Sequence, residues 1–121
     1  MKNWNKEVVT ALKSNADIVK GLARGEAGIY HDTAPDVGEY PFISYYTISV
    51  TPSLHADNAL AAYQQVYRVT IASDKRQGEQ ELANAVYDAL TGAGFMWQQT
   101  VETNDGKEYY ITLDFIISKE M

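Results

Sequence analysis

The sequence contains no cysteine, only two histidines and three prolines, and fewer basic than acidic residues. Without cysteine, the chain cannot form a disulfide, a cysteine metal site or a catalytic thiolate. With three prolines among 121 residues and a hydrophobic share of 45%, the composition is typical of a folded globular chain rather than a disordered one. We therefore expect one domain spanning residues 1–121.

Long apolar runs and basic patches are also missing. No stretch approaches the roughly 18 apolar residues of a membrane span, and the first six residues lack the apolar segment of a signal peptide. We expect a soluble protein made in a cytoplasm. Ten lysines and arginines stand against sixteen acids. Because phosphate neutralisation supplies most nucleic-acid affinity, we predict no specific nucleic-acid binding.

Motifs that carry chemistry are absent too. The sequence has no HxH, HExxH, GxSxG, Walker or GxGxxG pattern. His31 and His55 both fall in expected loops, and a metal site needs at least three convergent ligands. We predict no catalytic residue, no cofactor and no metal ligand, and therefore not an enzyme. A hydrolase that uses His31 or His55 with a nearby carboxylate is an alternative.

The strongest structural pattern is a strand followed by a helix between Tyr63 and Leu90. Gln65 to Ala72 is rich in β-branched and aromatic residues, with one face expected in the core. The helix that follows has apolar residues on a single face, and Gly92 and Gly94 end it. The expected core residues of this unit are Tyr67, Val69, Ile71, Leu82, Ala83, Val86 and Leu90.

The other elements are arranged around this unit. We expect a helix from Asn3 to Ser14, a short second helix within residues 15–22, and a short strand at Ala27 to Tyr30. A strand from Phe42 to Val50 should place its even residues (Phe42, Tyr46, Ile48, Val50) toward the core. A late hairpin pairs Phe95 to Glu102 with Lys107 to Ser118 around Asn104-Asp105-Gly106.

These elements predict an α+β fold. The sheet is mostly antiparallel and four-stranded, and two main helices pack on one of its faces. The segment from Thr51 to Ala62 lacks periodicity and is expected to be a long loop, between the second and third strands when the short strand is counted. Loops of that length are usually functional or disordered.

Nine tyrosines are the most informative part of the composition. Tyr45 and Tyr110 fall opposite the apolar sets of their strands, and Arg68 and Asp114 are also expected off the core face. Tyrosine and arginine are enriched where protein surfaces meet. We therefore predict that this face binds a partner or another copy of the chain, although Arg68 and Asp114 could instead form a structural cross-strand pair.

Several segments resemble one protein family. They are residues 17–22, Gly28-Ile29-Tyr30 before an acidic loop, Tyr40-Pro41-Phe42-Ile43, residues 67–73, the helix with Ala85, Val86 and Leu90, and the late hairpin. In this order they resemble the tail terminator and tail completion proteins of long-tailed bacteriophages, which include the tail-to-head joining proteins. The resemblance covers nearly the whole chain.

The resemblance implies a structural subunit that closes into a ring, usually a hexamer, on the head-proximal end of the tail tube. There it stops tube polymerisation and joins the tail to the head connector or stopper protein. DNA only passes through the lumen, and no membrane or cofactor is involved. Such a protein resides in the virion tail or neck after assembly in the bacterial cytoplasm, whether the genes belong to a phage or a prophage.

The expected interface residues come from the tyrosine-bearing face and the long loop, which should reach a ring neighbour or the tail tube. They are Tyr45, Thr47, Pro52, Ser53, Leu54, His55, Asp57, Arg68, Tyr110 and Asp114. Two alternatives stay open. One is another neck or connector component, and the other is a small ligand-binding module whose pocket would be lined by Tyr46, Tyr67 and Tyr109.

Overall fold

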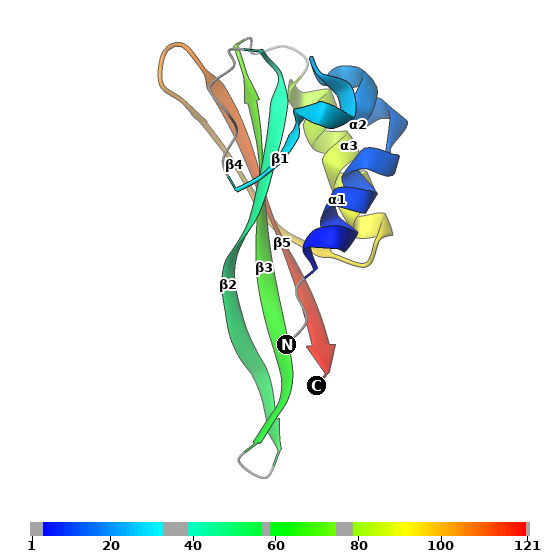
Figure 1. Cartoon of the computed structure of the whole chain (residues 1–121). Coiled ribbons are helices and arrows are strands. Elements are labelled where there is room, and N and C mark those ends of the chain that lie inside the picture. The colour runs from blue at the N-terminus through cyan, green and yellow to red at the C-terminus, as the bar shows by residue number, and fades with distance from the viewer. Residues whose placement is uncertain (1–3, 33–38, 57–58, 75–78, 121) are drawn as a thin grey trace.

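Helices cover one face of a single five-stranded sheet in the computed structural model (Figure 1), which describes residues 4–32, 39–56, 59–74 and 79–120. The elements in chain order are α1 (Asn5–Ser14), α2 (Ala16–Gly21), a 3₁₀ turn (Gly25–Gly28), β1 (Ile29–His31), β2 (Phe42–Ala56), β3 (Ala59–Ser73), α3 (Glu79–Gly92), β4 (Met96–Asn104) and β5 (Tyr109–Glu120). The predicted α+β class is confirmed, with one more strand and one more helix than expected.

The strand order is β1-β2-β3-β5-β4. β1 pairs with β2 in parallel, while β2–β3, β3–β5 and β5–β4 are antiparallel. The strand beyond the four of the predicted sheet is β1, which lies near the short strand expected at Ala27 to Tyr30. It has three residues and borders only the stretch of β2 from Ile43 to Tyr45. The sheet is therefore mostly antiparallel, as its sequence pattern indicates.

Strand alternation in β3 and β5 separates the two faces of the sheet. Tyr67, Val69 and Ile71 are buried beneath the helices, which we call the helix-covered face. The intervening residues, including Arg68 and Thr70, lie on the opposite, open face. Ile111, Leu113, Phe115 and Ile117 of β5 follow the same alternation and complete the core, as the sequence predicts.

The helices bury the faces predicted from their periodicity. Val8 and Leu12 of α1 and Val86 and Leu90 of α3 are fully buried in the core. Asn15 caps α2, because its Oδ1 accepts the backbone N–H groups of Asp17 and Ile18 at 2.9 and 3.1 Å. A Cβ at Gly21 would lie 2.8 Å from Leu82 Cδ2, so glycine at this position lets α2 pack closely on α3.

The face assignment predicted for β2 is wrong. Ile43 and Tyr45 are buried on the helix-covered face, while Phe42 and Tyr46 are half-buried on the open face. The reason is a β-bulge at Ile48, where Thr47 pairs with Tyr67 but Ser49 pairs with Val66. The extra residue exchanges the two faces of the strand. Odd-numbered residues lie on the helix-covered face before Ile48, and even-numbered residues lie on that face directly after it.

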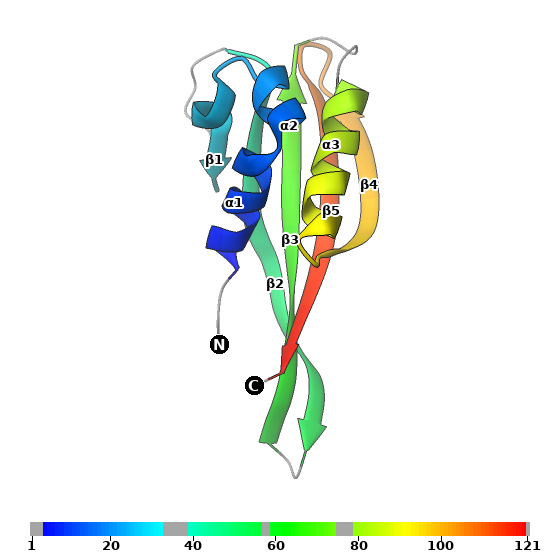
Figure 2. The same ribbon diagram turned by 90° about the vertical axis from the view of Figure 1, so that its right-hand side faces the viewer.

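The prediction of a long loop is also wrong, because most of residues 51–62 belong to strands. β2 and β3 form one long hairpin in which Pro52 pairs with Tyr63 and Ala56 pairs with Ala59. We call residues 49–56 and 59–66 the arm. Figures 1 and 2 show the arm projecting beyond the helical layer, accompanied on one side by the end of β5. Backbone pairing continues through the arm, and Tyr63, Gln65 and Val66 near its base are buried.

We predict that Val86→Ala lowers the free energy of unfolding by about 2 kcal/mol, because it removes two buried carbons and leaves a cavity. Val86 is fully buried, whereas Val101 on β4 is 44% exposed. The matched change Val101→Ala should alter the free energy by no more than about 0.5 kcal/mol. Urea denaturation of both variants measures the difference. Equal losses would contradict the assignment of these two faces.

Candidate interaction surface

A buried ion pair lies at the centre of the open face. The Arg68 guanidinium donates to both carboxylate oxygens of Asp114, from Nε to Oδ1 at 2.8 Å and from Nη2 to Oδ2 at 3.0 Å. Gln99 Nε2 donates to the same Oδ2 at 2.8 Å. Three neighbouring strands, β3, β5 and β4, are therefore joined by one carboxylate. The predicted cross-strand pairing of Arg68 and Asp114 is confirmed.

This pair is asymmetric in its exposure. The side chain of Asp114 is 2% exposed and that of Arg68 is 34% exposed. The hydrogen bond from Arg68 lowers the pKa of Asp114, burial opposes that shift, and the hydrogen bond from Gln99 supports it. In turn, the hydrogen bond with Asp114 raises the pKa of Arg68. Both groups stay charged at neutral pH, and Arg68 alone of the two presents surface to solvent.

A second polar cluster lies at the end of the sheet near the β4–β5 turn. The hydroxyl groups of Tyr40 and Tyr110 donate to the two carboxylate oxygens of Glu108. The hydrogen bond to Glu108 is the main cause that raises the pKa of Tyr110 to about 12. Both tyrosines are half-buried. Tyr110 is thus held as a neutral hydrogen-bonding group on the open face.

The structure separates the residues that were predicted to share one interaction face. Arg68, Tyr110 and Asp114 do lie on the open face, but Asp114 is buried beneath Arg68. Tyr45 is 6% exposed in the core, so its predicted exposure is wrong. Thr47 pairs with Tyr67 on the helix-covered side. The bulge at Ile48 explains both errors, because the expected face of β2 was assigned across it.

The remaining predicted interface residues lie in the arm. Pro52, Ser53, Leu54 and His55 belong to β2. Pro52, Leu54 and His55 pair with β3, and Ser53 lies at a shift in the register. Asp57 lies outside the described residues. The sequence analysis expected residues 52–55 in a loop, whereas the structure places them in a strand.

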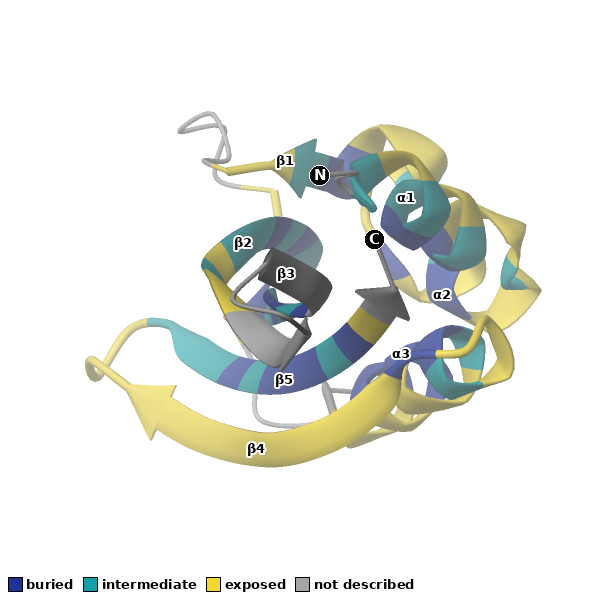
Figure 3. Ribbon diagram, turned by 90° about the horizontal axis from the view of Figure 1, so that it is seen from below, coloured by how far each residue is buried: buried dark blue, intermediate teal, exposed yellow. Residues whose placement is uncertain are grey.

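Sequence reasoning missed an exposed apolar edge at β4. All nine residues of β4 are exposed (Figure 3), including Met96 at 70%, Trp97 at 47% and Val101 at 44%. Trp97 packs edge-on against Tyr87 of α3, with ring centroids 6.0 Å apart. The sequence did contain a signal for this edge. Met96 and Trp97 are adjacent, so apolar side chains fall on both faces of the strand, whereas a strand with one buried face alternates apolar and polar residues.

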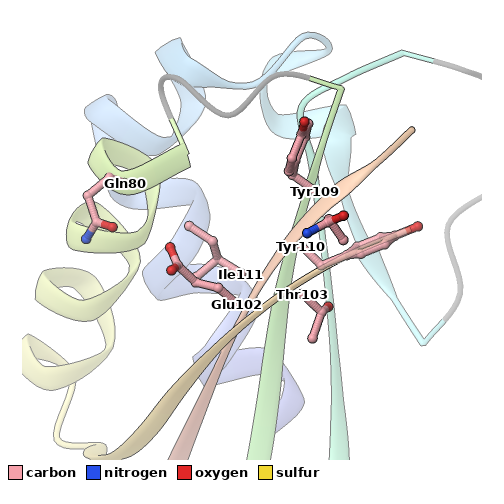
Figure 4. A pocket seen from close by; sticks show the side chains of 7 residues that line it. Gln80, Glu102, Thr103, Tyr109, Tyr110 and Ile111 are labelled. Atoms are coloured by element: carbon pink, nitrogen blue, oxygen red, sulfur yellow. The ribbon is translucent and has the colours of Figure 1, made fainter. Parts of the chain in front are cut away.

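A surface pocket of about 220 Å³ lies between α3 and the β4–β5 hairpin, and the described residues of its lining include no histidine, serine or pair of carboxylates. It is lined by the exposed carboxylate of Glu102, Gln80 and residues of the β4–β5 hairpin (Figure 4). Of the tyrosines expected around a ligand pocket, Tyr109 lines this hollow, whereas Tyr67 is buried in the core and Tyr46 lies on the open face. These three side chains do not form one pocket.

The alternative of a hydrolase that uses His31 with a nearby carboxylate has weak geometry. His31 Nδ1 lies 3.6 Å from Asp32 Oδ2, and both side chains are largely exposed, at 46% and 68%. In the part of the chain that the structure describes, no group of three potential metal ligands comes together. None of the described helices has the length and apolar character needed to cross a membrane.

Comparison with known proteins identifies the family. Residues 6–119 match the family model described as tail completion protein gp17. The chain belongs to this family. The tail completion family acts in bacteriophage tail morphogenesis, and this chain is one of its structural assembly proteins. No curated protein matches the sequence.

A solved structure supports the fold of this tail completion protein. It is described as that of the bacteriophage SPP1 gp17 protein. The match covers 93% of this chain and 86% of the solved chain, with a TM-score of 0.51 and 18% sequence identity. At this identity the likeness concerns the fold, and the contacts of this chain are argued below from its own residues.

We predict that Asp114→Asn lowers the free energy of unfolding by about 2 kcal/mol at pH 7, since it weakens charge-assisted hydrogen bonds around a buried group. The hydrogen bond from Arg68 holds the folded pKa of Asp114 below its ordinary value of 3.8. The wild-type advantage is therefore complete above about pH 5 and is lost as the pH falls through the folded pKa.

Urea denaturation of the wild type and the variant between pH 7 and pH 3 measures this difference. Asp88→Asn is the control, because Asp88 is exposed on α3 and has no ion pair within the described chain. Its curve should run parallel to that of the wild type. An advantage over Asp114→Asn that stayed constant down to pH 3 would contradict the role assigned to the carboxylate.

Proposed function

We propose that this protein assembles as a ring, a hexamer, on the head-proximal end of the tail tube. There it stops tube polymerisation and joins the tail to the head connector or stopper protein. The observation that carries the proposal is the family match over residues 6–119. It assigns the chain to tail completion, and the ring, the capping step and the named partners extend that assignment.

The arm supports a role in binding a ring neighbour or the tail tube. It projects beyond the helical layer (Figure 1), while the core side chains lie in the rest of the sheet and in the helices. A partner can therefore contact residues 52–55 without disturbing the packed domain. Asp57, which lies outside the described residues, is proposed as a further contact from its place in the sequence. A projecting hairpin offers a partner a long surface for main-chain and side-chain contacts, and binding there requires little change in the rest of the subunit.

The open face supplies a second contact surface. Arg68 keeps a third of its surface exposed while its guanidinium is fixed by Asp114, and Tyr110 is fixed by Glu108. Side chains that are already held in place lose little conformational freedom when a partner binds. The proposed contact residues on this face are Arg68 and Tyr110.

The charge of the chain agrees with a ring through which DNA passes. The net charge is −6, so phosphate groups are repelled rather than bound by the subunit as a whole. In this proposal the DNA has no specific site on the protein. The partners are other copies of the chain, the tail tube protein and the connector.

The proposal is tested by adding the purified protein to growing tail tubes and measuring tube lengths by electron microscopy. Capping should stop elongation at one end, with density for several subunits at that end. Tubes that grow to the same lengths with and without the protein would overturn the termination role. Binding to connectors but not to tubes would favour the alternative of a neck component.

We predict that deleting residues 53–58 abolishes the joining of tails to heads but leaves the domain folded. Pro52 pairs with Tyr63, so after the deletion residues 59–62 form a four-residue loop that closes a shorter hairpin. Thermal unfolding should stay cooperative, and complementation of a phage lacking the gene should give no joined virions. Normal virion yield from the deletion would show that the arm is not a contact surface.

The control for this deletion is Lys107→Ala. Lys107 is exposed at the β4–β5 turn, at the opposite end of the sheet from the arm. This variant should complement the phage as well as the wild type does. A similar loss of virions with Lys107→Ala would indicate a general defect rather than a specific role for the arm.

A further inference from the structure

Charge is distributed unevenly along the chain. Residues 2–24 contain five lysines and arginines and two acids, whereas residues 79–106 contain five acids and no lysine or arginine. The first segment includes α1 and α2, and the second includes α3 and β4. One part of the helical layer is therefore basic and the other acidic, although the whole chain is acidic.

The fold places these two segments on opposite sides of the subunit. Figure 2 shows α1 and α2 on the side of β1 and α3 on the side of β4, and β1 and β4 are the two outer strands of the sheet. We call the side with α1, α2 and β1 the basic flank, and the side with α3 and β4 the acidic flank.

The two lysines of α1 point away from α3. Trp4, at the start of α1, contacts Phe95, which follows the end of α3, with ring centroids 6.3 Å apart. At about 100° per residue, Lys6 and Lys13 lie roughly 160° and 180° around the helix from Trp4. Both lysines are exposed. They are thus directed outward from the basic flank.

The acidic flank presents Glu81 and Asp88, which are both exposed on α3. Within the described part of the chain, Lys6, Lys13, Glu81 and Asp88 form no ion pair. Their charges are therefore not balanced by partners inside the same subunit, and they remain available to a second molecule.

The sheet edges on the two flanks are also unprotected. β4 is paired only with β5, and its nine exposed residues include no lysine, arginine or proline. Monomeric proteins usually protect such an edge with those residues or with a covering element. On the other side, β1 borders only residues 43–45 of β2, and Ile48 and Val50 farther along are 38% and 45% exposed. Each flank thus combines an open strand edge with exposed apolar side chains.

We propose that the occupant of the acidic flank is the basic flank of a second copy of this chain. Lys6 and Lys13 of one copy face Glu81 and Asp88 of the next, and the β4 edge lies along the exposed part of β2. Because the two surfaces differ and lie on opposite sides of one subunit, the contact is head-to-tail and generates a closed ring when the rotation per subunit is suitable. This inference rests on the proposed ring and names the surfaces that build it.

The test uses two charge-reversed variants. One carries Lys6→Glu and Lys13→Glu, so that all four facing positions are acidic, and the other carries Glu81→Lys and Asp88→Lys, so that all four are basic. Each variant alone should occupy tube ends at least tenfold more weakly than the wild type at low salt, because like charges meet at every contact. An equal mixture should recover occupancy, since the two variants can alternate around a ring with an even number of subunits.

The measurement is occupancy of tail-tube ends by a fluorescently labelled protein, with circular dichroism to verify folding. Lys107→Glu is the control, because it reverses a charge at the β4–β5 turn away from both helices, and it should bind as the wild type does. If the wild type binds tube ends and each reversed variant binds equally well alone, or if the mixture fails to recover, the flank assignment is wrong and the proposed function stands. If the wild type itself does not bind, the proposed function fails first.

Discussion

The structure depends on the pairing of β3 along both of its edges. All but a few of its residues pair with β2 on one side and with β5 on the other. A strand held in this way has a fixed register, and its alternation decides which side chains meet the helices and which do not. Tyr67 accepts a hydrogen bond from the backbone of Trp4 on one face, and Arg68 binds Asp114 on the other. Both faces of the domain are therefore set by one strand.

The elements that were predicted correctly are those with a sustained pattern and a covering layer. Tyr67, Val69 and Ile71 alternate without interruption, and Val86 and Leu90 recur at helical spacing, because each of these series is buried against the other. Residues 51–62 of the arm were not predicted as strand, since they lack apolar periodicity and their pairing depends on backbone hydrogen bonds. β1 was expected as a short strand but not counted in the sheet, because three residues in a parallel pair carry little local signal of their partner.

The candidate surface was predictable only where its residues face each other directly. Arg68 and Asp114 occupy paired positions on adjacent strands, so alternation alone places them on one face. Gln99 reaches the same carboxylate because a bulge at Gln98 shifts the register of β4. A bulge of this kind has no clear signature in the residues around it. The charged flanks depend on how α1 and α3 lie across the sheet, which no local pattern specifies.

The bulge at Ile48 divides one continuous hairpin into two parts with independent faces. Removing or adding a single residue there would exchange the two faces of β2 from Ser49 onward while leaving the packing of Ile43 and Tyr45 unchanged. A change of one residue can thus present a different set of side chains to a partner without altering the core. Substitutions, insertions or deletions beyond this bulge can therefore change the arm during evolution without changing the folded domain.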